Sequence, residues 1–261
     1  MSSTRRQFII SGSLATIASG LGRRGSEPSL KKGWAGNNTK FHKKFGVHWY
    51  YNWTLGNPKN GPEFTPMLKG KAQTNQRALK RLESYPNLPN ILGYNEPERA
   101  KQGNLSLEQA LEFWPKLQAV AEKKGSRLSS PIPSSDREGL EWLDEFMTQA
   151  KQRKLKVDFI AIHYYRSRNP DDLEKFIKNI AKEYRLPIWL TEFNGWSGPR
   201  KDHEDFLKDA LKFLERERKV ERYAYFNPGK GKPHSLVEED CLLYTSPSPR
   251  DQRGSRMPSS A

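Results

Sequence analysis

Short apolar segments alternate with longer amphipathic segments along most of the chain from residue 45 onward. The apolar segments are rich in β-branched and aromatic residues, and they end at polar residues, as buried parallel strands do. We expect strands at 45–52, 64–68, 90–95, 127–132, 157–165, 188–193 and 222–226.

The amphipathic segments carry apolar residues at helical spacing. After Ser106, a suitable N-cap, the residues Leu107, Leu111 and Trp114 fall on one face of a helix. We expect helices at 106–124, 136–154, 170–184 and 204–218.

Regular alternation of strands and helices predicts an α/β fold with a parallel sheet. Seven or eight strands in a chain of this length favour a (β/α)8 TIM barrel, in which the chemistry lies at the carboxyl ends of the strands. A doubly wound open sheet is the alternative, but the first strand is not followed by the Gly-rich phosphate loop common in that fold.

The two ends of the chain differ in composition from the barrel region, which we place at 45–240. Residues 1–24 contain Arg5-Arg6 followed by a short apolar run, which indicates a twin-arginine export signal without stable membrane insertion. A disordered basic N-terminus is the alternative. Residues 25–44 are polar and predict a linker. We therefore expect an exported protein, periplasmic or extracellular.

The last segment, 241–261, reads CLLYTSPSPRD, three further residues, and SRMPSSA. This resembles a translated sequencing adapter, and a disordered Ser/Pro-rich tail is the alternative. With an adapter there, the barrel is C-terminally truncated and lacks its last helix.

The amino-acid composition favours some classes of function over others. The formal charge is +15, but much of it lies in the two terminal segments or alternates with acidic residues on helices, so we do not expect nucleic-acid binding. The seven Trp and ten Tyr suit flat contacts with sugar rings. The single Cys lies in the tail and the five His are scattered, so we expect no metal site and no cofactor.

Two carboxylates stand directly at the ends of strong predicted strands, Glu96 in Asn95-Glu96-Pro97 and Glu192 in Thr191-Glu192-Phe193. Glycoside hydrolysis needs a carboxylic acid that protonates the leaving oxygen and a carboxylate that attacks the sugar or activates water. The sequence therefore predicts Glu96 and Glu192 as catalytic residues. Salt bridges to neighbouring Lys or Arg are the structural alternative.

Polar and aromatic residues near these strand ends are candidates for binding sugar. Asn95 can hydrogen-bond a sugar hydroxyl, while Trp49, Tyr51 and Trp53 form an aromatic run in which one parity packs inward and the other faces a cleft. Trp196 follows the second Glu strand.

His163 and Tyr165 end another strand on the same side. We count both as substrate-binding candidates. His163 has two further interpretations, in which it positions Glu192 or is a buried structural residue.

The chain resembles the Asl1-like glycosyl hydrolase catalytic domain, which includes glycoside hydrolase family 128. Five motifs occur in the order of that family: 47–53 (VHWYYNW), 92–97 (LGYNEP), 158–165 (DFIAIHYY), 188–193 (IWLTEF) and 222–226 (RYAYF). The chain departs from the family pattern at Glu98, where Asp is usual, and near Lys69, where a Trp is expected.

The resemblance implies a (β/α)8 barrel and retaining hydrolysis of β-1,3-glucan, with Glu96 as acid/base and Glu192 as nucleophile. It places these residues on the fourth and seventh strands, whereas our count gives the third and sixth, so one strand before Asn90 is missing from the prediction. Two other functions stay open: a relative that cleaves another β-linked polysaccharide, and a catalytically silent carbohydrate-binding protein. We expect a monomer whose partner is a polysaccharide or oligosaccharide.

Overall fold

The computed structural model describes residues 29–56, 61–195, 198–229, 231–238 and 241–242. Eight parallel strands follow one another along the chain: β1 (Lys32–Ala35), β2 (Trp49–Tyr51), β3 (Glu63–Phe64), β4 (Asn90–Ile91), β5 (Arg127–Leu128), β6 (Ile160–Tyr164), β7 (Ile188–Phe193) and β8 (Val220–Phe226). The α-helices among these residues are α1 (Thr39–Phe45), α2 (Gln76–Glu83), α3 (Leu107–Lys124), α4 (Arg137–Gln152), α5 (Pro170–Tyr184) and α6 (Arg200–Arg216). A 3₁₀ turn, η1 (Lys71–Gln73), precedes α2, and an antiparallel pair, β9 (Val237–Glu238) and β10 (Cys241–Leu242), follows β8.

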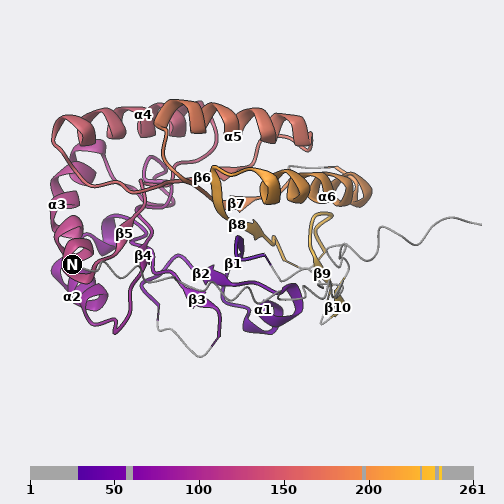
Figure 1. The fold of residues 1–261 in the computed structure, drawn as a ribbon, viewed down its shortest axis with the longest axis horizontal. Helices are drawn as coiled ribbons and strands as arrows, with labels where there is room; N and C mark the ends of the chain where they lie inside the picture. The colour runs from indigo at the N-terminus through magenta and orange to yellow at the C-terminus, as the bar shows by residue number, and fades with distance from the viewer. Residues whose placement is uncertain (1–28, 57–60, 196–197, 230, 239–240, 243–261) are drawn as a thin grey trace, which may run out of the picture.

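Pairing passes from each strand to its neighbour around all eight. Six strands form a sheet in the order β3-β2-β1-β8-β7-β6, and β4 pairs with β5. The bridges Met67–Leu92 and Ser129–Phe159 join these two groups. Figure 1 shows the helices arranged around the strands, as in a (β/α)8 barrel. No helix follows β2 or β8 within the described part of the chain.

The missing strand is β1, and it lies in the segment 25–44 that we expected to be a linker. β1 has four residues, of which one is Lys and one is Gly, so no apolar run marks it in the sequence. It pairs with both β2 and β8. With β1 counted, Glu96 follows the fourth strand, β4, and Glu192 lies in the seventh, β7. These are the strand numbers that the family resemblance implies.

The interior of the barrel is filled by large side chains. Ten buried residues form a cluster inside the ring of strands: Ala35, Trp49, Tyr51, Met67, Leu92, Ile132, Phe159, Ala161, Trp189 and Ala224. The Trp189 ring packs at 4.3 Å from that of Phe159 and at 5.1 Å from that of Trp49. A second, larger cluster lies between the strands and the helices. A filled interior leaves the carboxyl ends of the strands for polar chemistry.

Gly33 in β1 lies directly against the Trp49 indole, and a Cβ built at Gly33 would come within 2.2 Å of it. We expect Gly33→Ala to lower the free energy of unfolding by about 1–3 kcal/mol, because the packed indole has to shift. Urea denaturation measures this change. An unchanged midpoint would show that β1 is not packed against β2 as described.

Two further observations bear on the rest of the chain. In the described residues, no helix has the length and apolar character needed to cross a membrane. β10 lies within the predicted tail, while residues 243–261 and the export signal 1–24 lie outside the described residues.

Candidate active site

Glu96 stands just past the end of β4 in a strained backbone conformation. Its φ angle is +40°, in the left-handed region that costs a residue with a side chain about 1 kcal/mol or more. Its amide donates to the carbonyl of Ile132 at 2.7 Å, which ties this turn to the segment after β5. The Glu96 side chain is 17% exposed, so it is reachable from solvent.

Glu192 lies near the end of β7, and its carboxylate is surrounded by donors. The Trp53 indole donates to Oε1 at 2.7 Å, and the Tyr51 hydroxyl lies 2.8 Å from the same oxygen. The Tyr165 hydroxyl donates to Oε2 at 2.5 Å. Burial alone would raise the pKa of Glu192, but His163 and these donors outweigh burial and lower the pKa to about 2. Glu192 is therefore an ionised carboxylate at neutral pH.

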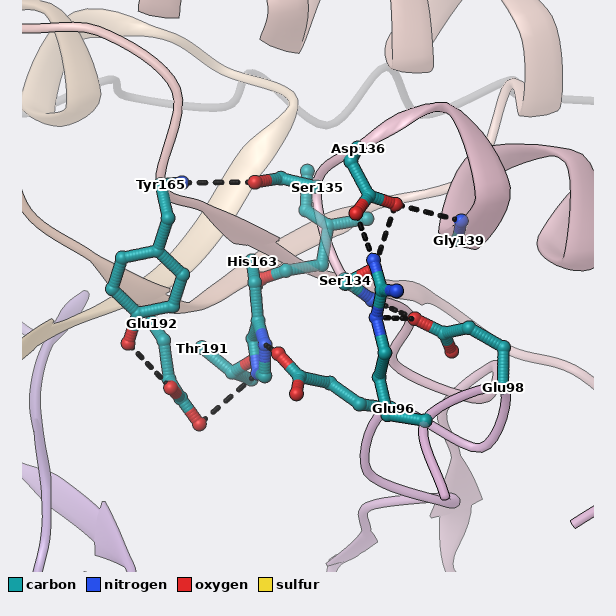
Figure 2. A network of polar contacts seen from close by, with 12 residues as sticks. Glu96, Glu98, Ser134, Ser135, Asp136, Gly139, His163, Tyr165, Thr191 and Glu192 are labelled. Carbon is teal, nitrogen blue, oxygen red and sulfur yellow. Dashed lines mark hydrogen bonds and ion pairs between the residues drawn. The ribbon is translucent and has the colours of Figure 1, made fainter. Parts of the chain in front are cut away.

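His163, on β6, lies between the two glutamates (Figure 2). Its Nδ1 is 3.1 Å from Oε1 of Glu96, within hydrogen-bond geometry. Its Nε2 is 3.1 Å from Oε1 of Glu192, an ion pair whose angle departs from that of a hydrogen bond. Burial lowers the pKa of His163, but the two carboxylates outweigh burial and raise the pKa to about 9. The buried imidazole is thus a cation at neutral pH.

The two tyrosines that touch Glu192 remain protonated. Burial raises the pKa of Tyr51 and of Tyr165 well above the ordinary value, and the adjacent Glu192 carboxylate raises both further. Both hydroxyls therefore stay protonated at neutral pH and act as donors. They fix the carboxylate of Glu192 in one orientation.

A cleft of about 980 Å³ lies above the glutamates and crosses the end of the barrel. Lys69, Lys101 and Gln102, from the loops after β3 and β4, line part of it. Pro228, Lys232 and His234 line another part, from the loop after β8, on the opposite side of the ring of strands. Such a cleft has room for several sugar rings of a chain laid across the site.

The cleft brings together five of the residues predicted from the sequence. Asn95, Glu96, Glu192, Trp53 and Tyr165 all line it. Asn95 is 2% exposed, and its side-chain oxygen has no hydrogen-bond partner among the described residues. A buried acceptor without a donor, placed at a cleft, suits a ligand hydroxyl.

Three predicted binding residues lie elsewhere. Trp49 is fully buried in the barrel interior, with its indole donating to the carbonyl of Lys31, so it does not line the cleft. Tyr51 and His163 are also buried, and their polar atoms contact the glutamates. The physical reason is the inward parity of β2, which sends Trp49 and Tyr51 into the barrel. Trp196 lies outside the described residues.

The sequence-based prediction missed other residues of the cleft. Asn194 and Phe226 line it at the ends of β7 and β8, and the Asn194 side chain donates to the Phe226 carbonyl at 3.2 Å. The Phe226 ring stands edge-on to Trp53 and Tyr165. Position at a strand end was a signal for both. Within the described ranges, no group of three His, Cys, Asp or Glu could hold a metal ion.

Solved structures that resemble this chain share its fold over most of its length. An endo-β-1,3-glucanase of glycoside hydrolase family 128, subgroup I, from Amycolatopsis mediterranei, in complex with laminaritriose, is 29% identical, with a TM-score of 0.72 over 82% of this chain and 95% of that one. A subgroup II endo-β-1,3-glucanase from Sorangium cellulosum is 29% identical, with a TM-score of 0.70 over 80% and 93%. A subgroup III curdlan-specific exo-β-1,3-glucanase from Blastomyces gilchristii, in complex with glucose, is 30% identical, with a TM-score of 0.69 over 83% and 96%.

Comparison with curated proteins found no match. The family model described as glycosyl hydrolase catalytic core matches residues 29–251, which cover the whole barrel and part of the segment after it. With its barrel and its two glutamates at the ends of the fourth and seventh strands, the chain belongs to the glycosyl hydrolase catalytic core family and is a glycoside hydrolase of the family 128 type.

Proposed function

We propose that the protein is an endo-β-1,3-glucanase that works by a retaining mechanism. The observation that carries the proposal is a pair of glutamates held by opposite nitrogens of one imidazole at a cleft open to solvent. The laminaritriose complex and the family 128 relatives support β-1,3-glucan as the substrate.

In the first step, the carboxylate of Glu192 attacks the anomeric carbon as the glycosidic C–O bond breaks. Protonated Glu96 gives its proton to the departing oxygen, so that the leaving sugar is released as an alcohol. The pKa of Glu192, about 2, keeps this nucleophile ionised. The product of the step is a glycosyl ester on Glu192.

In the second step, water attacks the same carbon, Glu96 accepts a proton from the water, and the ester bond to Glu192 breaks. The sugar leaves with its original anomeric configuration. The donors from Tyr51 and Trp53 on one oxygen of Glu192, and from Tyr165 on the other, hold the carboxylate while the ester forms and breaks. A neutral ester accepts these hydrogen bonds less strongly, so the donors also favour its hydrolysis.

Internal cleavage is favoured by a cleft that is lined from the loop after β4 to the loop after β8, because a glucan can then extend to both sides of the glutamates. We further propose that residues 1–24 direct export of the protein. It would then act on its polysaccharide substrate outside the cytoplasm.

Incubation with a soluble β-1,3-glucan is expected to release reducing ends together with oligosaccharides of several lengths. Chromatography of the early products, beside assays on β-1,4-glucan and mixed-linkage glucan, tests the substrate. Glucose as the sole early product would replace the endo proposal with an exo one. Release from β-1,4-glucan alone would refute the linkage.

A further inference from the structure

The backbone strain at Glu96 requires that neighbouring groups hold the residue in place. Two backbone hydrogen bonds close the turn on its carbonyl, from the amides of Arg99 at 3.0 Å and Gly103 at 3.2 Å. Gly103 itself packs against the backbone of Asn95 and Pro97, so closely that a Cβ there would come within 2.6 Å. The conformation of Glu96 therefore depends on where the segment 97–103 is anchored.

Glu98 provides one anchor. Its side chain is only 3% exposed, and its Oε1 accepts a hydrogen bond from the amide of Ser134 at 2.9 Å. The Nε of Arg99 lies 3.6 Å from the same oxygen and compensates the buried charge. The bond spans from the loop after β4 to the loop after β5, so Glu98 joins two neighbouring loops.

Arg99 provides the second anchor at the start of helix α4. Its guanidinium contacts Asp136, the N-cap of that helix, and donates to Ser134 Oγ at 3.1 Å and to Glu138 at 2.9 Å. Asp136 and Glu138 are themselves favoured at a helix N-terminus. A planar guanidinium held by several oxygens is much more rigid than a single surface ion pair.

The loop 134–136 is also connected to Glu192, the proposed nucleophile. The Ser135 hydroxyl accepts a hydrogen bond from the backbone amide of Tyr165 at 2.9 Å, and the Tyr165 hydroxyl donates to Glu192. Figure 2 shows the contact of Ser135 with Tyr165 and that of Tyr165 with Glu192. The loop 134–136 is thus connected to Glu96 through Glu98 and Arg99, and to Glu192 through Ser135.

We propose that Glu98 and Arg99 are positioning residues for the reaction, which hold the acid/base Glu96 in its strained conformation against the loop 134–136. The inference rests on the proposed function, since it concerns proton transfer by Glu96. Arg99 lines the cleft, whereas Glu98 does not, so Glu98 acts on catalysis through Glu96 alone.

Two substrates distinguish a positioning role from a general loss of active-site structure. Cleavage of β-1,3-glucan needs a proton for the leaving sugar, whereas a 2,4-dinitrophenyl β-laminarioligoside has a leaving group that departs without one. Added azide attacks the glycosyl ester without a general base. For Arg99→Ala and Glu98→Ala we expect kcat on the glucan to fall by roughly 10²-fold with little change in KM. Turnover of the dinitrophenyl substrate with azide should remain close to that of the wild type.

Two matched variants complete the experiment. Glu98→Gln keeps an acceptor for the Ser134 amide, so it should recover most of the glucan activity lost in Glu98→Ala. Arg137→Ala removes an exposed ion pair with Glu141 within the same helix and should leave both activities unchanged. Melting temperatures of all variants report whether folding is affected.

Equal losses on both substrates would overturn the proposal in favour of a structural role. A rise in KM alone in Arg99→Ala would mean that Arg99 contacts the sugar. Unchanged glucan turnover in both alanine variants would also overturn it. Wild-type protein without turnover on either substrate would instead refute the proposed function, and this inference with it.

Discussion

Replacement of Glu192 by glutamine is expected to lower kcat on β-1,3-glucan by a factor on the order of 10⁴ or more, as loss of a covalent nucleophile does in other enzymes. The amide has nearly the same shape as the carboxylate, but it is neutral and a weak nucleophile. The amide oxygen can still accept from Tyr51 and Trp53, and the amide NH2 can donate to the Tyr165 hydroxyl, so the fold should be preserved. Reducing-sugar release beside a melting curve measures both effects.

The retaining mechanism makes a sharper prediction for alanine variants supplied with azide. In Glu192→Ala, azide enters from the face that the nucleophile occupied, and a single displacement gives an α-glycosyl azide. In Glu96→Ala, the ester on Glu192 forms from a 2,4-dinitrophenyl β-laminarioligoside, whose leaving group departs without a proton. Azide then attacks the ester from the opposite face, and two displacements give a β-glycosyl azide. NMR of the anomeric proton distinguishes the two products.

The same anomer from both variants would refute the division of roles between Glu96 and Glu192. Full activity of Glu192→Gln would refute the mechanism altogether. Glu141, an exposed glutamate on α4 outside the cleft, offers a control, since Glu141→Gln should leave kcat unchanged.

Much of the barrel could be predicted because its longer strands and its helices carry strong periodic signals. β6 and β7 are fully buried along their length and read as continuous apolar runs that end at His163 and Glu192. β1 could not be found in this way, because a strand of four residues gains its stability from neighbours on both sides that are distant in sequence.

The two glutamates were predictable for a chemical reason, since few carboxylates end a strong strand. The orientation of the aromatic run was not predictable, because the barrel interior and the helix-facing side are both apolar. Trp49 and Tyr51 point inward, while Tyr50 packs on His42 and Phe64 outside the ring of strands. Trp53, just past the strand, has a φ of +57°, and its indole donates to Glu192.

Contacts that depend on the packing of several loops gave no signal in the sequence. Position at a strand end suggested that His163 could position Glu192, but its simultaneous contact with Glu96 follows from the curvature of the ring between β4 and β7. The contact of Glu98 with the Ser134 amide likewise joins residues 36 positions apart.

Replacement of His163 by glutamine is expected to lower the free energy of unfolding by about 3 kcal/mol near pH 6, because it leaves the buried carboxylate of Glu192 without its cation. We also expect kcat on glucan to fall by roughly 10²-fold, since both glutamates lose the group that fixes them. Denaturant unfolding as a function of pH, with parallel kinetics, measures the two effects.

The pKa shifts set the pH window of this stabilisation. The pKa of His163 is raised from 6.5 to about 9, so its contribution is complete below pH 6.5 and is lost as pH rises through about 9. The pKa of Glu192 is lowered from 4.5 to about 2, so its contribution is complete above pH 4.5 and is lost as pH falls through about 2. The difference in stability between wild type and His163→Gln should therefore be largest between pH 4.5 and 6.5.

His42 provides a control with the opposite sign. It is also buried, but burial lowers its pKa, and it packs on Tyr50 away from the cleft. Its folded state favours the neutral ring, so any stability that the wild type has over His42→Gln should grow as pH rises toward 6.5 and stay level above it. A stability difference for His163→Gln that follows the pattern of His42→Gln would mean that His163 is a neutral core residue. The two glutamates would then have to be held by their other hydrogen bonds alone.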